Sequence, residues 1–338
     1  MWHIIGQPQA VSLLESSLNR GQLCHAYLFV GPPRVGKMTL ALDLAQAVNC
    51  TAEAAPCAEC PACRRIAAGK HADVRVIGLN SNHNGAEGRP KAEIGIDEIK
   101  ELRNAASLPP YEGKHKVFII DGAEHLSNEA ANCLLKTLEE PPPQVLFILL
   151  ATKERLLLPT IVSRCQRLEL HPLSRKAVAE ALAERRGTDA QKAKLVASLS
   201  GGCLGWALAA EGDERLLAQR SQKIEELLQV AAAGYEERFA YAAQLATRFG
   251  HDRPSALDAL KLWLSWWHDL LLVKTGCGDW ITNVDQEAVL FHQAAGYKLA
   301  QIKGAIDSLQ AAGEQLDRNA NPRLALEVLM LNLPLKRG

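Results

Sequence analysis

The sequence predicts an α/β domain with a parallel sheet, followed by domains that contain only helices. Over residues 1–170, short apolar runs alternate with stretches of helical periodicity, and this alternation is typical of a doubly wound parallel sheet. The apolar runs lack polar alternation, as expected for strands that are covered on both faces. After residue 173 the apolar runs stop, and the remaining sequence has helical periodicity.

Four apolar runs, rich in Val, Ile, Leu and Phe, are the predicted strands. They are residues 26–30, 73–79, 116–121 and 145–152. The helical stretches between them include residues 37–50 and 128–140. Residues 80–90 are rich in Asn and Gly, which predicts a surface loop.

The composition is that of an ordinary soluble globular protein. Of the 338 residues, 48% are hydrophobic and 22% are charged. The 38 Lys and Arg residues balance 38 Asp and Glu residues, which excludes a protein that coats nucleic acid by bulk positive charge. Any contact with DNA must therefore be local or shared with partners.

The sequence gives no sign of membrane insertion or secretion. No run approaches the roughly 20 apolar residues that cross a bilayer. Residues 1–10 lack the basic segment and apolar stretch of a signal peptide. We therefore expect a cytoplasmic protein without a membrane partner. In that compartment, nine cysteines are more often metal ligands or buried thiols than disulfides.

The strand predicted at residues 26–30 runs directly into a Gly-rich loop and then a helix. The loop, GPPRVGKMT at residues 31–39, is typical of a phosphate-binding loop. Gly31 and Gly36 would let backbone N–H groups turn toward phosphate oxygens, and the N-terminus of the next helix favours an anion. Lys37 would reach the β- and γ-phosphates.

This loop lacks the hydroxyl that the motif requires. Ser or Thr should follow the lysine directly as a Mg²⁺ ligand, but Met38 occupies that position and Thr39 comes one residue late. A thioether cannot replace a hydroxyl on a hard cation. The sequence thus allows ATP binding, with Thr39 kept as a candidate, and disfavours hydrolysis assisted by Mg²⁺.

Two other predicted strands end in candidate residues for the same nucleotide site. Asp121 ends the apolar run 116–121, as the carboxylate of a Walker B strand does, and is placed to assist Mg²⁺. Thr152 ends the run 145–152. The carboxyl ends of parallel strands meet at one edge of a sheet, where nucleotides bind.

Four cysteines follow the first predicted helix of the core. Cys50, Cys57, Cys60 and Cys63 have the spacing C-x6-C-x2-C-x2-C, and four thiolates this close can form a closed tetrahedral zinc site. Closely spaced cysteines also hold Fe–S clusters, and four unrelated buried thiols are the third interpretation. The other five cysteines are scattered, and we expect them to be buried small residues.

Several longer motifs resemble one known family. These are IIGQPQAV at residues 4–11, AANCLLKTLEEPP at 130–142, LLLPTIVSRCQRLEL at 156–170 and NPRLALEVLMLNLP at 321–334. They resemble the bacterial clamp-loader subunits of the AAA+ family, and the resemblance spans nearly the whole chain. Clamp-loader domains of this kind carry zinc where Cys50–Cys63 lie, so the resemblance favours structural Zn²⁺.

The resemblance implies three domains. They are an AAA+ core at residues 1–172 with a four-cysteine zinc module at 50–63, a helical lid at 173–211, and a helical collar at 212–338. In the family, the collar joins tau/gamma-type and delta-type subunits into an open hetero-pentamer. That ring loads a sliding clamp onto primer–template DNA, so the expected partners are these subunits and, through the complex, the clamp and the DNA.

Three departures from the family pattern fall on the nucleotide site. Met38 replaces the Mg²⁺ ligand, and Gly122 stands where active members carry a catalytic Glu after the Walker B Asp. Glu124 lies two residues further on, too far to be assigned that role. Trp206, in the lid segment 200–210, stands where the family has an Arg that contacts nucleotide. Together these changes favour a delta-prime-type subunit with little ATPase or polymerase activity of its own.

Two alternatives remain open at the level of sequence. One is an ATP-hydrolysing tau/gamma-type motor subunit of the same machine. The other is a phosphate-loop kinase or nucleotidyltransferase with a zinc-bearing lid, which needs neither the long helical C-terminus nor the Ser-Arg-Cys segment.

Arg164 carries the function that the resemblance implies. In clamp loaders, the matching Arg of the Ser-Arg-Cys motif at 163–165 projects from one subunit toward ATP bound by the next. A guanidinium there stabilises the charge that develops on the γ-phosphoryl oxygens. The alternative is a structural salt bridge.

Three tryptophans lie on one face of a predicted helix near the C-terminus. Trp263, Trp266 and Trp267 are three and four residues apart, which is helical spacing. We expect them to belong to a helical core, and a subunit interface is the alternative.

Overall fold

The computed structural model describes residues 2–79, 93–318 and 320–335, so the surface loop predicted at 80–90 lies outside it. The chain divides into two compact units. One contains the described residues up to Leu173 together with Cys203–Gly205, and the other contains Ser174–Gly202 and the residues from Trp206 onward. The three-domain division stays a prediction. None of the described helices is both long and apolar enough to cross a membrane.

The first unit is built on a five-stranded parallel sheet with the strand order β2-β3-β4-β1-β5. The strands are β1 (Ala26–Val30), β2 (Val74–Gly78), β3 (Lys116–Asp121), β4 (Val145–Ala151) and β5 (Gln166–Glu169). All residues of the central strands β1 and β4 are buried. The predicted α/β class and its four apolar strands are confirmed.

The fifth strand, β5, was not predicted from the sequence. It has four residues, and only Leu168 among them is buried. Its place at the sheet edge comes from pairing with β1, in which Tyr27 lies opposite Gln166. A strand this short, with one buried apolar residue, is too short to show a periodic pattern in the sequence. Its stability comes from pairing with β1.

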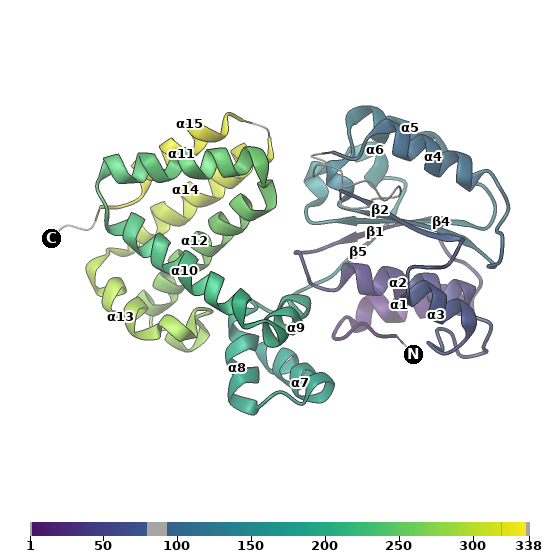
Figure 1. The fold of residues 1–338 in the computed structure, drawn as a ribbon, viewed down its shortest axis with the longest axis horizontal. Coiled ribbons are helices and arrows are strands. Elements are labelled where there is room, and N and C mark those ends of the chain that lie inside the picture. Colours follow the sequence, from purple (N-terminus) through teal and green to yellow (C-terminus); the bar gives the residue numbers. More distant parts are fainter. Residues whose placement is uncertain (1, 80–92, 319, 336–338) are drawn as a thin grey trace. The chain divides into compact units, whose positions relative to one another are not determined.

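Helices cover both faces of the sheet (Figure 1). They are α1 (Pro8–Asn19), α2 (Lys37–Asn49), α3 (Pro61–Ala67), α4 (Ile96–Ala106), α5 (Asn128–Glu139) and α6 (Pro159–Val162). Because side chains of a strand alternate between faces, Leu28 of β1 packs with α4, α5 and α6, whereas Phe29 packs with α1, α2 and α3. The sheet therefore lies between two apolar layers, which fix the positions of the strands and of the loops that follow them.

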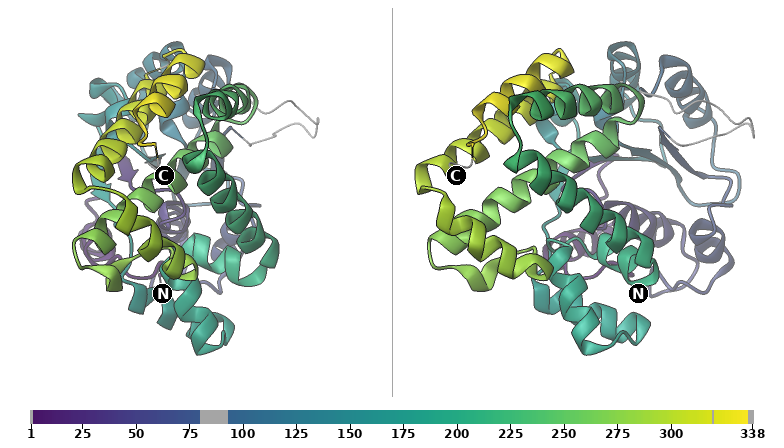
Figure 2. Two further views of the ribbon diagram at one scale, coloured as in Figure 1. Left: turned by 90° about the vertical axis from the view of Figure 1, so that its left-hand side faces the viewer. Right: turned by 60° about the vertical axis from the view of Figure 1, so that its left-hand side comes forward.

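The second unit contains helices and no strand among its described residues (Figures 1 and 2). The helices are α7 (Arg175–Arg186), α8 (Ala190–Leu199), α9 (Leu204–Gly212, which belongs to this unit from Trp206 onward), α10 (Glu214–Ala232), α11 (Tyr235–His251), α12 (Arg253–Lys274), α13 (Glu287–Gly296), α14 (Leu299–Asp317) and α15 (Pro322–Asn332). The predicted helical character of the C-terminal half is confirmed.

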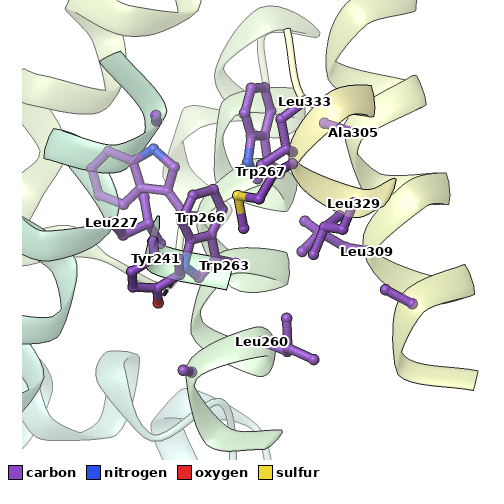
Figure 3. Close-up of a cluster of buried hydrophobic side chains, with 14 of the residues drawn as sticks. Leu227, Tyr241, Leu260, Trp263, Trp266, Trp267, Ala305, Leu309, Leu329 and Leu333 are labelled. Carbon is purple, nitrogen blue, oxygen red and sulfur yellow. Dashed lines mark hydrogen bonds between the residues drawn. The ribbon is translucent and has the colours of Figure 1, made fainter. Parts of the chain in front are cut away.

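The tryptophans of α12 form the centre of this helical unit (Figure 3). Trp263, Trp266 and Trp267 are each at most 2% exposed. Trp263 packs against Tyr241 with ring centroids 6.0 Å apart, and Trp267 packs against Tyr297 at 5.2 Å. The core interpretation of this aromatic stripe is confirmed.

A buried arginine joins the ends of two helices in the same unit. Arg238 is fully buried, and its guanidinium donates hydrogen bonds to the carbonyls of Ala231 (2.7 Å), Leu333 (2.8 Å) and Pro334 (3.0 Å). These carbonyls lie at the C-terminal ends of α10 and α15, where a cation is favoured by the helix dipole.

Candidate functional site

The phosphate loop connects β1 to α2, as the sequence predicted. The N–H of Gly31 donates to the carbonyl of Ala151 on β4 at 3.2 Å, which anchors the start of the loop. Gly36 is the N-cap of α2 with φ of 113°, a conformation that favours glycine. A Cβ at Gly36 would lie 2.4 Å from Cδ1 of Ile4, so the N-terminal segment packs closely on the loop.

Lys37 is buried and hydrogen-bonded to carbonyl groups of the loop. Its Nζ donates to the carbonyls of Gly31 at 2.5 Å and Pro32 at 2.9 Å. Met38, the next residue, packs against the apolar layer formed by α1 and α2. Thr39 is partly buried one residue later in α2. The loop therefore has the strand–loop–helix arrangement that the sequence predicted, and it offers no hydroxyl directly after the lysine.

Asp43 fixes the segment that lies against this loop, and sequence reasoning missed it. Its buried carboxylate accepts hydrogen bonds from the N–H groups of His3 (2.8 Å) and Ile4 (2.9 Å), and it lies 2.7 Å from Nδ1 of His3. The available signal was an acidic residue within the apolar helix 37–50, since a buried carboxylate needs partners.

Asp121 lies at the end of β3, near the phosphate loop. Asp121 is exposed at the strand end, yet partial desolvation of its carboxyl group raises its pKa; the cation of Lys37 opposes that rise, and the carboxylate of Glu124 adds to it. The sheet thus brings Lys37 and Asp121 together, as predicted. Trp206 is a partly buried residue of α9 and belongs to the second unit.

Glu124 is bonded to Thr152, a contact that the sequence did not predict. Its Oε1 accepts hydrogen bonds from the backbone N–H of Thr152 at 2.9 Å and from its Oγ1 at 2.5 Å. Its Oε2 is buried and has no hydrogen-bond partner among the described residues. The carboxylate of Glu124 therefore holds both polar donors of the predicted nucleotide residue Thr152.

Gly122 lies between Asp121 and Glu124 and forms the turn that separates them. Its φ is 77°, in the left-handed region, and its N–H donates to the carbonyl of Leu150 at 3.1 Å. A Cβ at this position would lie 2.9 Å from Cδ2 of His125. A side chain at position 122 would thus strain the backbone and crowd His125.

The four predicted cysteines meet at one point. The Sγ atoms of Cys50, Cys57, Cys60 and Cys63 all lie within 4.8 Å of one another. Four sulfurs around one tetrahedral zinc at Zn–S distances of about 2.3 Å would be about 3.8 Å apart, and the Cys57 and Cys63 sulfurs are separated by 4.0 Å. The N–H groups of Cys60 and Cys63 point at the sulfurs of Cys57 and Cys60. This cluster could hold a metal ion.

The thiols of the cluster differ in acidity. Burial opposes ionisation of Cys60, but backbone N–H groups of Cys63 and Thr51 outweigh it and bring the pKa of Cys60 to about 5. The N–H of Cys60 lowers the pKa of Cys57, whereas burial and the neighbouring Cys60 raise the pKa of Cys63 to about 12. A bound metal must displace the remaining protons, since only thiolates are ligands.

The remaining cysteines do not form a second cluster within the described residues. Cys133, Cys165 and Cys203 are partly buried, but Cys24 and Cys277 are exposed, so the expectation of burial was wrong for these two. Cys24 lies in the connection between α1 and β1, and Cys277 follows α12; connecting segments run over the protein surface.

The cysteine module is tied to the turn that precedes β3. The carbonyl of Cys50 accepts a hydrogen bond from Nζ of Lys114 at 2.6 Å, and the side-chain oxygen of Asn49 accepts one from the N–H of His115 at 2.9 Å. Asp73, which is 3% exposed, accepts three more from the N–H groups of residues 111–113 at 2.7–2.8 Å. Polar side chains therefore define this turn.

Arg164 follows the short helix α6, at the surface of the first unit. Its Nη1 donates to the carbonyl of Thr160 at 2.9 Å, and its Nη2 donates to Oε1 of Glu139 at 2.6 Å. The side chain of Arg164 is 33% exposed and that of Glu139 is 50% exposed. Arg164 thus makes an ion pair within the chain and still presents part of its guanidinium to solvent.

Comparison with known families gives two matches. A profile described as DNA polymerase III, delta subunit matches residues 6–174. A second, described as DNA polymerase III, delta subunit, C terminal, matches residues 214–334.

Known relatives carry related names. The DNA polymerase III subunit tau of Bacillus subtilis is 29% identical over 355 residues, which cover 98% of this chain and 60% of the relative. Subunit delta' of the same organism is 28% identical over 328 residues, which cover 97% of this chain and 96% of the relative. Subunit tau of Salmonella typhimurium is 37% identical over 172 residues, which cover 50% and 25%. The chain thus spans less than two thirds of the tau relatives.

Similarity to solved structures also extends along most of the chain. One example is a DNA polymerase III gamma subunit-related protein from Thermotoga maritima, 19% identical with a TM-score of 0.40, and the match covers 96% of this chain and 99% of that one.

The turn organised by Asp73 leads to a prediction about pH. Burial opposes ionisation of Asp73, but the N–H groups of Tyr111, Glu112 and Gly113 outweigh it and lower its pKa. A lowered pKa in the folded state stabilises the protein above the unfolded pKa, and this contribution disappears as pH falls through the folded value. We expect Asp73→Asn to lower the free energy of unfolding at pH 7 by about 1–3 kcal/mol.

Chemical denaturation between pH 7 and pH 3 checks this expectation. The difference between wild type and Asp73→Asn should shrink below about pH 4. Asp307→Asn, on the exposed face of α14, should behave like the wild type throughout. A difference that is independent of pH would contradict the assignment of an ionised Asp73.

Proposed function

The chain belongs to the DNA polymerase III delta-subunit family, and on that basis we propose that it is a delta-prime-type subunit of a bacterial clamp loader. In this role it joins tau/gamma-type and delta-type subunits in a ring that loads a sliding clamp onto primed DNA. It works by docking to ATP-hydrolysing neighbours and has little or no ATPase or polymerase activity of its own.

The extent of the matches supports the delta-prime type over the tau/gamma type. The alignment with subunit delta' of Bacillus subtilis covers 96% of that relative, whereas the alignment with its subunit tau covers 60%. The three departures from the active family pattern, at Met38, Gly122 and Trp206, point in the same direction.

The observation that carries the proposal is the arrangement after β3. The position next to Asp121 is a glycine with φ of 77°, and the nearest other acid, Glu124, is hydrogen-bonded to Thr152. Position 122, where active members carry the acid that orients a water for attack on the γ-phosphate, therefore has no carboxylate, and Oε1 of Glu124 is taken up by Thr152. With Met38 in place of the Mg²⁺ ligand, the site is suited at most to holding a nucleotide.

Arg164 is the residue that we propose acts on the ATP of the neighbouring subunit. We assign it as an arginine finger that acts in trans on ATP bound by the next subunit, where its guanidinium would stabilise transition-state charge. Its ion pair with Glu139 does not exclude this role. Exposed ion pairs contribute only about 0–1 kcal/mol, and a third of the Arg164 side chain stays exposed beside the pair, where a phosphate can reach it.

The cysteine cluster is proposed to hold one structural Zn²⁺ through Cys50, Cys57, Cys60 and Cys63. Four protein ligands leave no open position for a substrate water, so the ion would stabilise the fold and take no part in chemistry. The hydrogen bond from Lys114 to Cys50 would carry that stabilisation to the turn before β3.

Zinc content tests the metal assignment. We expect about one zinc per chain by elemental analysis. Cys60→Ser should lose the metal and unfold at lower temperature, because metal binding to a structural site is coupled to folding. Cys24→Ser, at an exposed cysteine outside the cluster, should keep both properties. A fully folded wild-type protein without metal would rule the site out.

Steady-state phosphate release tests the nucleotide site. The purified chain should show negligible ATP hydrolysis with Mg²⁺ and primed DNA, and Lys37→Ala should change nothing. Gly122→Glu should also remain inactive, because the backbone at that position is left-handed and the Mg²⁺ ligand is still missing. Turnover that Lys37→Ala abolishes would favour the tau/gamma-type motor.

Reconstitution of the whole loader tests Arg164. Arginine fingers contribute about 10³–10⁵ in rate in other phosphoryl-transfer enzymes, so we expect Arg164→Ala to reduce ATP-driven clamp loading sharply while the ring still assembles. The defect should lie at the nucleotide of the adjacent subunit. Arg167→Ala, in an exposed ion pair on β5, is the control and should load normally. Wild-type loading by Arg164→Ala would end the in-trans assignment.

A further inference from the structure

The ion pair between Glu139 and Arg164 joins two motifs that lie 25 residues apart in the sequence. Glu139 is the last residue of α5, and Arg164 directly follows α6 and Ser163. The two side chains meet at 2.6 Å, while the carbonyl of Thr160 holds the other arm of the guanidinium at 2.9 Å. The guanidinium is therefore fixed from two sides by the chain's own acceptors.

The requirements of the fold do not account for an acid at this position. Helix C-termini favour cations, so a carboxylate on the last residue of α5 opposes the helix dipole. The pair is also too exposed, at 33% and 50%, to contribute much to stability. A role in holding the cation explains the position of Glu139 better than a role in stabilising the helix.

The geometry leaves part of the guanidinium free to bind a phosphate. A guanidinium has five N–H donors. Nη1 donates to the carbonyl of Thr160 and, at 3.5 Å, to Oγ of Ser163, and Nη2 donates to Glu139, which leaves donors on Nε and Nη2. The remaining donors can form a fork for phosphate oxygens. A long side chain loses rotamer freedom when it binds, and fixing it beforehand reduces that entropic cost.

We propose that Glu139 is a positioning residue for Arg164, whose carboxylate holds the guanidinium in the orientation that meets the phosphates of a nucleotide bound by the neighbouring subunit. This inference rests on the proposed in-trans function of Arg164. Glu139 touches no nucleotide and acts only through the arginine.

The test uses the complete reconstituted loader with the clamp and primed DNA. Glu139→Gln keeps the shape of the side chain and removes its charge. We expect kcat for ATP hydrolysis to fall by about 2- to 5-fold, the effect of losing one exposed ion pair, with KM for ATP changed by less than about 2-fold. Glu139→Asp, which keeps the charge on a shorter stem, should recover part of the loss.

The matched control is Glu140→Gln, the same change at the next, exposed residue, and it should leave kcat unchanged. Size-exclusion chromatography of each complex separates a defect in assembly from a defect in hydrolysis. A loss of kcat in Glu139→Gln equal to that in Glu140→Gln would overturn the proposal, and so would a rise in kcat, since a rise would make Glu139 a competitor for Arg164.

A double-mutant cycle shows whether Glu139 acts through Arg164. In an Arg164→Ala background, Glu139→Gln should have no further effect, whereas a purely structural role would add its own loss. Additive losses would overturn the proposal. If Arg164→Ala alone leaves hydrolysis unchanged, the proposed in-trans function itself fails. If Arg164→Ala is defective and Glu139→Gln is not, only the positioning role fails.

Discussion

The parallel register of β1, β3 and β4 is the constraint on which the candidate nucleotide site depends. Both outer strands of this trio pair with β4, so Val30 lies opposite Ala151 and Asp121 lies opposite Leu150. The residue after each outer strand is then anchored by its N–H to a carbonyl of β4. This register brings Lys37, Asp121 and Thr152, from three separate stretches of sequence, to one edge of the sheet. Hydrogen bonds between strands, and not local preference, therefore set the site.

Two of the polar side chains at this edge, Lys37 and Thr152, are hydrogen-bonded within the chain. The ammonium of Lys37 lies on carbonyls of its own loop, and the carboxylate of Glu124 takes both donors of Thr152. Arg164 is also paired within the chain, with Glu139, but a third of its side chain still faces solvent. The chain thus keeps the strand–loop–helix arrangement of the core while Arg164 presents part of its guanidinium to solvent. This contrast agrees with a subunit whose contribution is made to a neighbour.

The cysteine module is also connected by hydrogen bonds to the turn that leads into β3. The carbonyl of Cys50 and the side chain of Asn49 hold the turn that leads into β3, and Asp73 holds the backbone of the same turn. Since β3 ends at Asp121, a well-ordered cysteine module would also help to fix the carboxyl end of β3. A structural metal would therefore stabilise more than the short loop that binds it.

The sequence by itself determined the elements whose residues carry a local pattern. Four strands, the phosphate loop, the cysteine spacing and the tryptophan face of α12 could be identified because buried strands, Gly-rich turns and helix faces each have a period or a spacing. The short edge strand β5, the buried Arg238 and the contact of Glu124 with Thr152 had no such pattern. Their partners lie far away in the sequence, and only folding brings them together. The pairing of Glu139 with Arg164 was decided in the same way, since packing of α5 beside α6 places an acid against a cation that neither motif predicts alone.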